Sequence, residues 1–137
     1  MNASRFLDTN ILLYAYDRDA PAKRAIAIEL VKQGWTSPGE TAISVQVLQE
    51  MHVNLAKRDL SHADATRIIE DFSTWPIVDN TFALLKVALE EQGRWKISFW
   101  DSMILAAARA SGATQLITED LNHGQDYAGI RVINPFI

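Results

Sequence analysis

The sequence of 137 residues contains no cysteine, which excludes disulfide bonds, thiolate zinc sites and a cysteine nucleophile. It has neither a Gly-x-Ser-x-Gly segment nor a glycine-rich phosphate loop, so a serine hydrolase of that type and a P-loop enzyme lack support. No apolar run approaches the roughly 18 residues that cross a bilayer, and Arg5 and Asp8 interrupt any signal-peptide core. We therefore expect a cytoplasmic protein with no membrane partner.

The chain also lacks an excess of positive charge. Its 13 lysines and arginines stand against 17 aspartates and glutamates, which gives a formal net charge of −4 at pH 7. This balance disfavours a protein that binds nucleic acid by diffuse positive charge, but not an enzyme that places metal ions between its carboxylates and the phosphates. The length and the 48% of hydrophobic residues predict one domain, residues 1–137, with a buried core.

Short apolar segments alternate with segments of helical periodicity. The short segments predict strands at residues 4–8, 41–43, 77–78, 115–118 and 131–133. The periodic segments predict helices at residues 11–16, 22–33, 44–55, 61–75, 81–92 and 98–111. Thr9 and Asn10 are expected to form a turn or helix cap, and Gly34, Gly93 and Gly112 to end helices. The alternation predicts an α/β sandwich with a mainly parallel central sheet flanked by helices.

Four acids lie at or near element boundaries, where sites gather in parallel sheets. Asp8 ends the first predicted strand and Asp120 follows the fourth, while Asp101 lies in the first turn of the last helix and Glu50 within the third. Each acid also has an ordinary structural explanation: Asp101 completes a capping box with Ser98, Asp120 caps a turn, and Glu50 is solvated. Asp8 is the hardest to explain in this way, because a charge at the end of a buried strand needs a partner.

Carboxylates that gather without cations repel one another, and hard divalent cations remove that repulsion. A ligand set made only of oxygens favours Mg²⁺ or Mn²⁺ over zinc. Two ions about 3.5–4 Å apart, or one ion with a positioned water, promote phosphodiester cleavage, and the spacing leaves both arrangements open. The histidines do not form a metal set, since His52 and Glu50 point to different faces of one helix and His62 and His123 are dispersed.

The four acids occur in segments that resemble the PIN-domain ribonucleases, specifically the VapC-type toxins of bacterial toxin–antitoxin pairs. The segments are FLDTNIL at 6–12, VLQE at 47–50, SFWDSMI at 98–104, LITEDL at 116–121 and a closing run at 123–136 that ends in GIRVINPF. One such segment would be weak evidence. All of them in order, over essentially the whole chain, make a specific resemblance.

The resemblance implies a PIN-like three-layer sandwich in which four acids surround Mg²⁺ or Mn²⁺. These acids are Asp8, Glu50, Asp101 and Asp120. It also implies supporting roles for Asn10 and Thr118. Glu119 competes with Asp120 for the last position, and the family pattern of Ser or Thr, any residue, then Asp favours Asp120.

The same resemblance implies the activity and the partners. The expected activity is endoribonucleolytic: a metal-activated water hydrolyses RNA phosphodiester bonds and leaves a 3′-hydroxyl and a 5′-phosphate. The expected partners are the RNA substrate, a cognate VapB-type antitoxin that neutralises the toxin, and a second copy of the chain in a homodimer, with a higher assembly formed with the antitoxin.

Two other functions remain alternatives. A non-catalytic α/β module that binds a metal through the same acids stays open. An aspartyl phosphatase is disfavoured, because its chemistry requires a second Asp two residues after Asp8, where this chain has Asn10.

Aromatic and basic side chains offer further nucleic-acid contacts. The candidates are Trp35, Trp75, Trp95 and Trp100 for bases and Lys23, Arg24, Lys57 and Arg58 for phosphates. Because aromatic residues at apolar positions usually pack in a core or interface, we expect Trp100 to pack beside Asp101. The basic pairs are expected on solvated helix faces.

Overall fold

The central sheet of the computed structural model, which describes residues 1–137, has five strands in the order β3-β2-β1-β4-β5. The strands are β1 (Arg5–Leu7), β2 (Thr41–Ser44), β3 (Ile77–Val78), β4 (Gln115–Ile117) and β5 (Arg131–Ile133). Every pair of neighbours is parallel, with Leu7 of β1 opposite Ile117 of β4. The carboxyl ends of all five strands therefore lie along one edge of the sheet.

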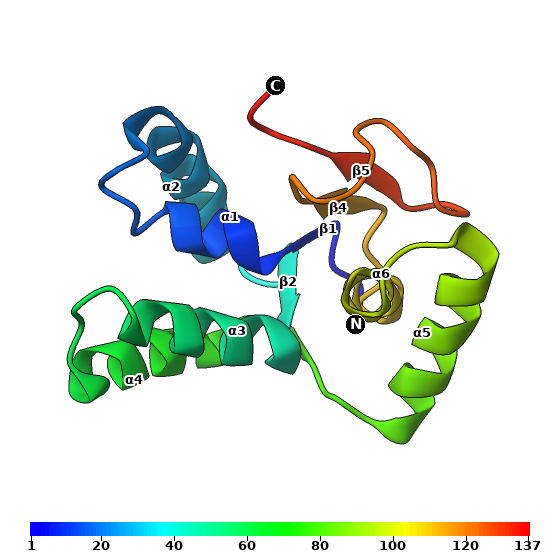
Figure 1. Cartoon of the computed structure of the whole chain (residues 1–137), viewed down its shortest axis with the longest axis horizontal. Coiled ribbons are helices and arrows are strands. Elements are labelled where there is room, and N and C mark those ends of the chain that lie inside the picture. Colours follow the sequence, from blue (N-terminus) through cyan, green and yellow to red (C-terminus); the bar gives the residue numbers. More distant parts are fainter.

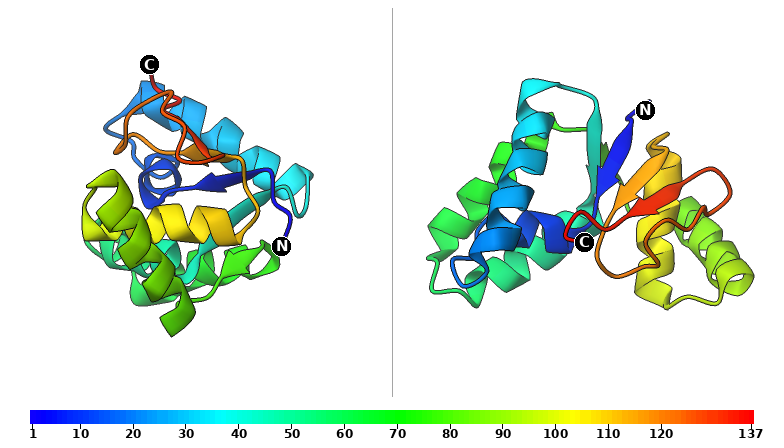
Figure 2. Two further views of the ribbon diagram at one scale, coloured as in Figure 1. Left: turned by 90° about the vertical axis from the view of Figure 1, so that its right-hand side faces the viewer. Right: turned by 90° about the horizontal axis from the view of Figure 1, so that it is seen from above.

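Helices cover both faces of this sheet. They are α1 (Thr9–Tyr14), α2 (Pro21–Thr36), α3 (Val45–Ala56), α4 (His62–Asp71), α5 (Phe82–Trp95) and α6 (Phe99–Ala110), with a 3₁₀ turn, η1 (Phe72–Thr74), after α4. Figures 1 and 2 show α2 and α6 on opposite sides of the sheet, with α1 beside α2 and α5 outside α6. The predicted three-layer α/β sandwich is confirmed. None of the helices combines the length and hydrophobicity needed to cross a membrane.

The core holds the strand and helix that carry two of the four acids. Phe6 and Leu7 of β1 and Leu105 of α6 are fully buried. Each such side chain stabilises the fold by about 1.5–3 kcal/mol relative to an exposed position. Helix α6 is buried along most of its length between the sheet and α5, because the alanines of its second half allow close approach. The elements that end at Asp8 and begin near Asp101 are therefore fixed by packing.

Two of the three glycines predicted to end helices lie inside them instead. Gly34 is within α2, where a Cβ atom would lie 2.3 Å from the ring of Trp75, so the glycine permits a close helix-to-ring contact. Gly93 is within α5, which ends at Trp95 and is followed by the C-cap residue Lys96 in the left-handed conformation with φ 56°. Gly112 does follow the end of α6 with φ +82°, as predicted.

Two further boundaries differ from the sequence prediction. Thr9 and Asn10 are the first residues of α1 rather than a turn or cap, because Asp8 is the N-cap residue and its carboxylate accepts a hydrogen bond from the Thr9 amide. The helix predicted at 61–75 ends at Asp71 and continues as η1. Trp75 is extended, consistent with its place before Pro76, whose ring disfavours a helical residue at that position.

Candidate active site

Asp8 and Thr118 lie side by side at the carboxyl ends of the adjacent strands β1 and β4. The amide of Asp8 donates to the carbonyl of Ile117 at 3.1 Å, which continues the strand pairing to the sheet edge. The Asp8 carboxylate accepts from the Thr9 amide at 2.7 Å and from the Thr118 hydroxyl at 2.8 Å. Asp8 is only 5% exposed and forms no ion pair. The sheet edge thus holds a buried carboxyl with no basic partner.

Burial raises the pKa of Asp8 to about 7, although the hydrogen bonds from Thr118 and the Thr9 amide oppose this rise. The nearby carboxylates of Asp120 and Glu50 raise the pKa further. A carboxyl in this environment is stabilised either by a proton or by a cation that takes the proton's place.

Asn10 links the ends of β1 and β4. Its side-chain amide donates to Asp120 Oδ2 at 3.0 Å and to Thr118 Oγ1 at 3.2 Å. Thr118 Oγ1 also accepts from the Asp120 amide at 3.1 Å. The Asn10 Oδ1 atom is buried and has no hydrogen-bond partner, so it is an oxygen available to a ligand. The two supporting residues therefore contact Asp8 and Asp120 directly.

Glu50 is on helix α3 and accepts hydrogen bonds from two residues that the sequence did not identify as part of the site. Thr9 Oγ1 donates to Glu50 Oε2 at 3.0 Å, and Gln46 Nε2 donates to Glu50 Oε1 at 2.7 Å. Gln46 is buried and lies four residues before Glu50, and this spacing places two side chains on the same helix face. That spacing is a signal the sequence did contain, whereas the Thr9 contact depends on the folded chain.

Asp101 enters the group from the first turn of α6. Ser98 caps this helix, and its hydroxyl oxygen accepts from the Asp101 amide at 3.1 Å. Burial raises the pKa of Asp101, a side-chain hydrogen bond with Ser98 lowers it, and the charges of Asp120 and Glu50 raise it. The Ser98 half of the expected capping box is therefore present, and the Asp101 carboxyl lies close enough to the other acids for their charges to act on it.

Glu119 is engaged elsewhere, although it is next to Asp120. The Tyr14 hydroxyl donates to Glu119 Oε1 at 2.7 Å, and Lys23 forms an ion pair with Glu119 Oε2 at 3.0 Å. The Lys23 side chain is 41% exposed, in agreement with the expected solvated helix face, and it also joins α2 to the segment after β4. Of the two neighbouring acids, Asp120 is the one hydrogen-bonded to Asn10.

The oxygen donors at this site are of the type that a hard cation prefers, but they do not converge on one point. The available donors are carboxylate oxygens and the free Asn10 Oδ1, and none of the four acids is neutralised by a basic side chain. No three His, Asp or Glu side chains converge in the geometry of a metal site. A cation shared by these acids therefore requires their side chains to rotate toward one another.

The remaining polar and aromatic candidates divide into packed and exposed residues. His123 Nδ1 accepts from the Asn134 amide at 2.9 Å, and the His52 and His62 rings pack together with centroids 5.6 Å apart. Trp75 is buried in the core as expected, but Trp100 is 64% exposed, so the prediction that it packs is wrong. An exposed indole thus lies directly beside Asp101 in the sequence.

The fold and the acid cluster agree with a family match. Residues 5–126 match the family described as PIN domain, and the chain belongs to this family. Among its relatives, ribonuclease VapC24 of Mycobacterium tuberculosis is 27% identical over 141 residues, with 94% of each protein covered.

Two solved structures of toxins are also similar to this chain over most of its length. A toxin–antitoxin complex from Klebsiella pneumoniae is similar with a TM-score of 0.68 and 26% identity, covering 96% of this chain and 98% of that chain. VapC20 of Mycobacterium tuberculosis, described as a toxin that cleaves the sarcin-ricin loop, is similar with a TM-score of 0.63 and 25% identity, covering 82% and 87%.

Proposed function

We propose that this chain is a VapC-type toxin: an Mg²⁺- or Mn²⁺-dependent endoribonuclease, in one PIN domain over residues 1–137, that a cognate VapB-type antitoxin neutralises. One observation carries the proposal. Asp8 is a buried carboxyl without a basic partner, and burial raises its pKa to about 7 among neighbouring acids at the carboxyl edge of a parallel sheet. Such a group is about half protonated at neutral pH, a cation favours its ionised form, and a divalent cation at that edge supplies phosphodiester chemistry.

The proposed metal ligands are Asp8, Glu50, Asp101 and Asp120. When bound, the metal lowers the pKa of an attacking water and offsets the charge that develops on the phosphate. Asp101 is only half-buried, so it is an acid that solvent and substrate reach.

The surrounding hydrogen bonds orient the acids in this proposal. Thr118 and the Thr9 amide fix the two oxygens of Asp8, and Asn10 holds Asp120. These contacts restrict the orientations of Asp8 and Asp120, and groups that touch only the ligands in this way affect metal affinity.

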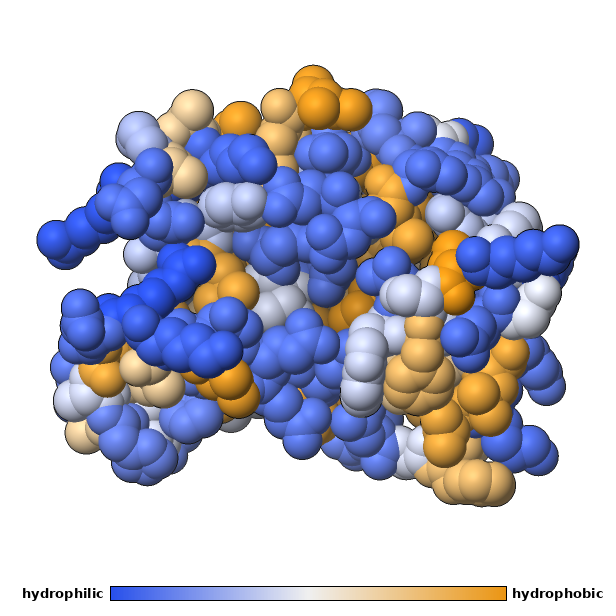
Figure 3. Space-filling model, viewed as in Figure 1, coloured by the Kyte–Doolittle hydropathy of each residue, from blue (hydrophilic) through white to orange (hydrophobic).

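The similar proteins support the proposed partners. One similar structure is described as a toxin–antitoxin complex and another as an RNA-cleaving toxin, which motivates an antitoxin and an RNA substrate for this chain. Hydrophobic side chains gather over α5 in Figure 3, where Phe82 and Leu89 are exposed, and such a surface suits a homodimer. Mass measurement of the chain alone and with its antitoxin tests the dimer and the higher assembly.

The direct test is RNA degradation by the purified protein with Mg²⁺ or Mn²⁺, with EDTA, and with the variants Asp8→Asn and Asp101→Asn. Cleavage is expected only for the wild type with metal, and its products are expected to carry 5′-phosphates. Asp64→Asn is the matched control, because Asp64 is exposed on α4 and pairs only with Arg67. This control is expected to retain full activity.

The outcomes separate the proposal from its alternative. Equal RNA degradation by the wild type and both site variants would show that the acids are not the site. Metal binding by the wild type without RNA cleavage would instead support a non-catalytic metal-binding module. Growth arrest on expression in a bacterial host, absent for Asp101→Asn, tests the toxin function separately from the chemistry.

A further inference from the structure

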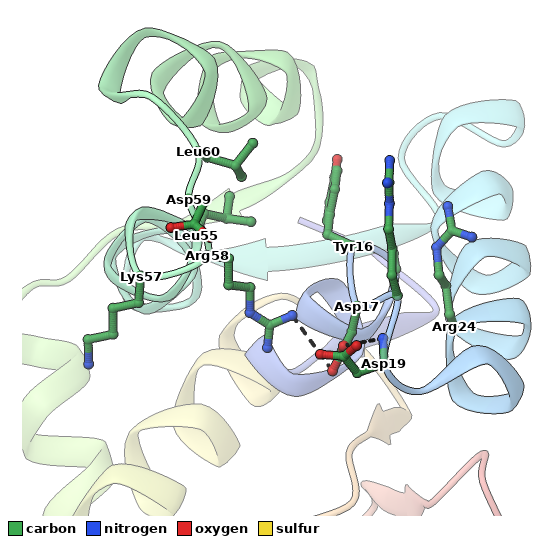
Figure 4. A pocket seen from close by; sticks show the side chains of 11 residues that line it. Tyr16, Asp17, Asp19, Arg24, Leu55, Lys57, Arg58, Asp59 and Leu60 are labelled. Atoms are coloured by element: carbon green, nitrogen blue, oxygen red, sulfur yellow. Dashed lines mark hydrogen bonds and ion pairs between the residues drawn. The ribbon is translucent and has the colours of Figure 1, made fainter.

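A charged pocket lies beyond the C-terminal ends of α1 and α3. Its volume is about 790 Å³, and it opens between the loop after α1, the start of α2 and the loop after α3 (Figure 4). The charged residues that line it are Arg18, Arg24, Lys57, Arg58, Asp17, Asp19 and Asp59. The rest of the lining includes Tyr16, Leu55 and Leu60.

Positive charge in this pocket is only partly neutralised. Arg58 pairs with Asp17 at 3.7 Å and joins the two walls, as Figure 4 shows. Arg18, Arg24 and Lys57 are exposed and form no ion pair or side-chain hydrogen bond. The lining therefore has four basic and three acidic side chains, an excess of one positive charge in a chain whose net charge is −4.

The pocket is connected to the acid cluster by two neighbouring helices. Helix α1 begins at Thr9, beside Asp8, and α3 carries Glu50, while both helices end at the pocket. At 1.5 Å per residue, the six residues from Thr9 to Ala15 and the five from Glu50 to Leu55 span about 8–9 Å, which reaches the near edge of the pocket. With stacked nucleotides about 3.4 Å apart along one strand, the pocket therefore lies at least two nucleotides from the cluster.

We propose that this pocket binds the phosphate backbone of an RNA strand, at least two nucleotides from the phosphate held at the acid cluster. This inference rests on the proposed function. Arg18 and Arg24 supply the main contacts, because their guanidinium groups have no partner and present several donors to phosphate oxygens. The pocket provides the positive charge that the acid-rich site lacks, so it supports RNA binding beside four carboxylates.

The test measures RNA affinity against salt concentration. Single-stranded 20-nucleotide RNA is titrated by fluorescence anisotropy with protein carrying Asp101→Asn, which keeps the RNA intact. The pocket variant combines Arg18→Gln and Arg24→Gln, and its matched control combines Lys32→Gln and Lys86→Gln, two exposed lysines on α2 and α5. Both double variants remove two positive charges, and all four side chains are exposed, so the fold is expected to persist.

The pocket variant is expected to bind RNA several-fold more weakly and to lower the slope of log affinity against log salt by about 1.4, or 0.7 per lost phosphate contact. The control is expected to keep the wild-type slope. An equal slope change in both variants, or none in the pocket variant, would overturn the proposal. If the pocket variant loses only its complex with an antitoxin, the pocket belongs to a protein partner. Absence of RNA cleavage by the wild type affects the proposed function alone, because this readout is binding.

A second observation, the exposure of Trp100, is independent of the pocket. Trp100 is 64% exposed in the first turn of α6, directly before Asp101. Its ring packs edge-on against Phe99 at a centroid distance of 4.9 Å, which restrains the indole while leaving it accessible. Core packing therefore does not account for this side chain.

We infer that Trp100 stacks on an RNA base next to the phosphate held at the acid cluster, an inference that also rests on the proposed function. Stacking on an aromatic side chain strengthens binding by about 5- to 150-fold per base and tolerates any base. Trp100 and Asp101 are consecutive in α6, so their side chains leave the helix about 100° apart, and a base stacked on Trp100 would lie to one side of the acids.

The test compares Trp100→Ala and Trp100→Phe with Ile28→Ala, which removes an exposed apolar side chain from α2, away from the surface proposed for the dimer. RNA affinity is measured as above, and the molar mass of each variant is measured alongside. Trp100→Ala is expected to lower affinity at least fivefold, Trp100→Phe to retain most of it, and Ile28→Ala to leave it unchanged. Unchanged affinity for Trp100→Ala, or a loss that accompanies dissociation of a dimer, would overturn the inference.

Discussion

The hydroxyl of Thr118 donates a hydrogen bond to the carboxylate of Asp8 at 2.8 Å, although the two residues are 110 positions apart. The contact exists because β1 and β4 are parallel neighbours that end at the same edge of the sheet. Thr118 Oγ1 also accepts hydrogen bonds from Asn10 and from the Asp120 amide. One fully buried hydroxyl therefore connects two of the proposed metal ligands.

Replacement of Thr118 by valine is expected to lower both stability and cleavage. Valine keeps the shape but leaves the buried Asp8 oxygen without a donor, which costs about 1–3 kcal/mol of folding free energy. RNA cleavage is expected to fall at least tenfold, as found for groups that orient metal ligands. Thr118→Ser is expected to restore most of both quantities, since serine supplies the same hydroxyl. Urea unfolding and initial cleavage rates measure the effects, and full activity of Thr118→Val would contradict a positioning role.

The stability of the metal-free protein is expected to fall as pH rises from about 4 to about 7. Burial raises the pKa of Asp8 from 3.8 to about 7 in the folded chain, so between these values the folded state binds a proton that the unfolded state has released. The stabilisation is therefore present at low pH and is lost as pH passes through the folded-state pKa. Asp8→Asn is expected to remove this dependence. Thermal unfolding in EDTA from pH 5 to pH 8 measures the difference between the two proteins, and parallel curves would contradict the prediction.

Divalent metal is expected to stabilise the folded chain. At a free metal concentration 100 times the Kd, binding adds about 2.7 kcal/mol. For a domain of this size that corresponds to a rise in Tm of roughly 9 °C. Thermal unfolding with Mg²⁺, Mn²⁺ or excess EDTA measures the shift at pH 8, where Asp8 is ionised. Asp64→Asn is expected to keep the shift and Glu50→Gln to reduce it. The same shift in both variants would exclude Glu50 as a ligand.

Gly34→Ala and Gly93→Ala are expected to change stability in opposite directions. Both glycines lie inside helices, where alanine is favoured by about 1 kcal/mol. A Cβ at Gly93 meets no atom within 4 Å, so that variant is expected to gain about this amount. A Cβ at Gly34 would lie 2.3 Å from the buried ring of Trp75, and such overpacking costs about 1–3 kcal/mol. Urea unfolding of both variants provides the comparison, and equal stabilisation would show that the ring moves freely.

The glycines also show why parts of the fold could not be predicted from the sequence. Glycine at C′ is the usual helix stop, and Gly112 follows that rule. Gly34 is present for a different reason, the approach of the Trp75 ring from 41 residues away in the chain, and no local pattern contains that contact. Trp100 is a second position where the local sequence misleads. Its apolar neighbours predicted packing, but in the first turn of α6 its side chain is exposed to solvent.

For the candidate site, the sequence predicted which residues take part but not which hydrogen bonds and ion pairs join them. Asp8, Glu50, Asp101 and Asp120 follow from the boundaries of predicted elements and from the resemblance. The sequence does not show which of the neighbouring acids Glu119 and Asp120 is engaged elsewhere. The fold decides this, because Lys23 of α2 pairs with Glu119. The contact of Thr9 with Glu50 likewise appears only when α1 and α3 are placed side by side, whereas the Gln46 contact lies within α3 at a four-residue spacing that the sequence does contain.

The sequence by itself determined the alternation of strands and helices, the α/β class and the absence of cysteine chemistry, because these depend on local periodicity and residue type. It also predicted the four acids as the site, from element boundaries and the resemblance. Tertiary structure decided which groups meet, since parallel pairing of β1 with β2 and β4 brings residues more than a hundred positions apart to one sheet edge. It also decided the electrostatics: Asp8 is an ordinary carboxylate in the unfolded chain, and only burial without a basic partner raises its pKa to about 7.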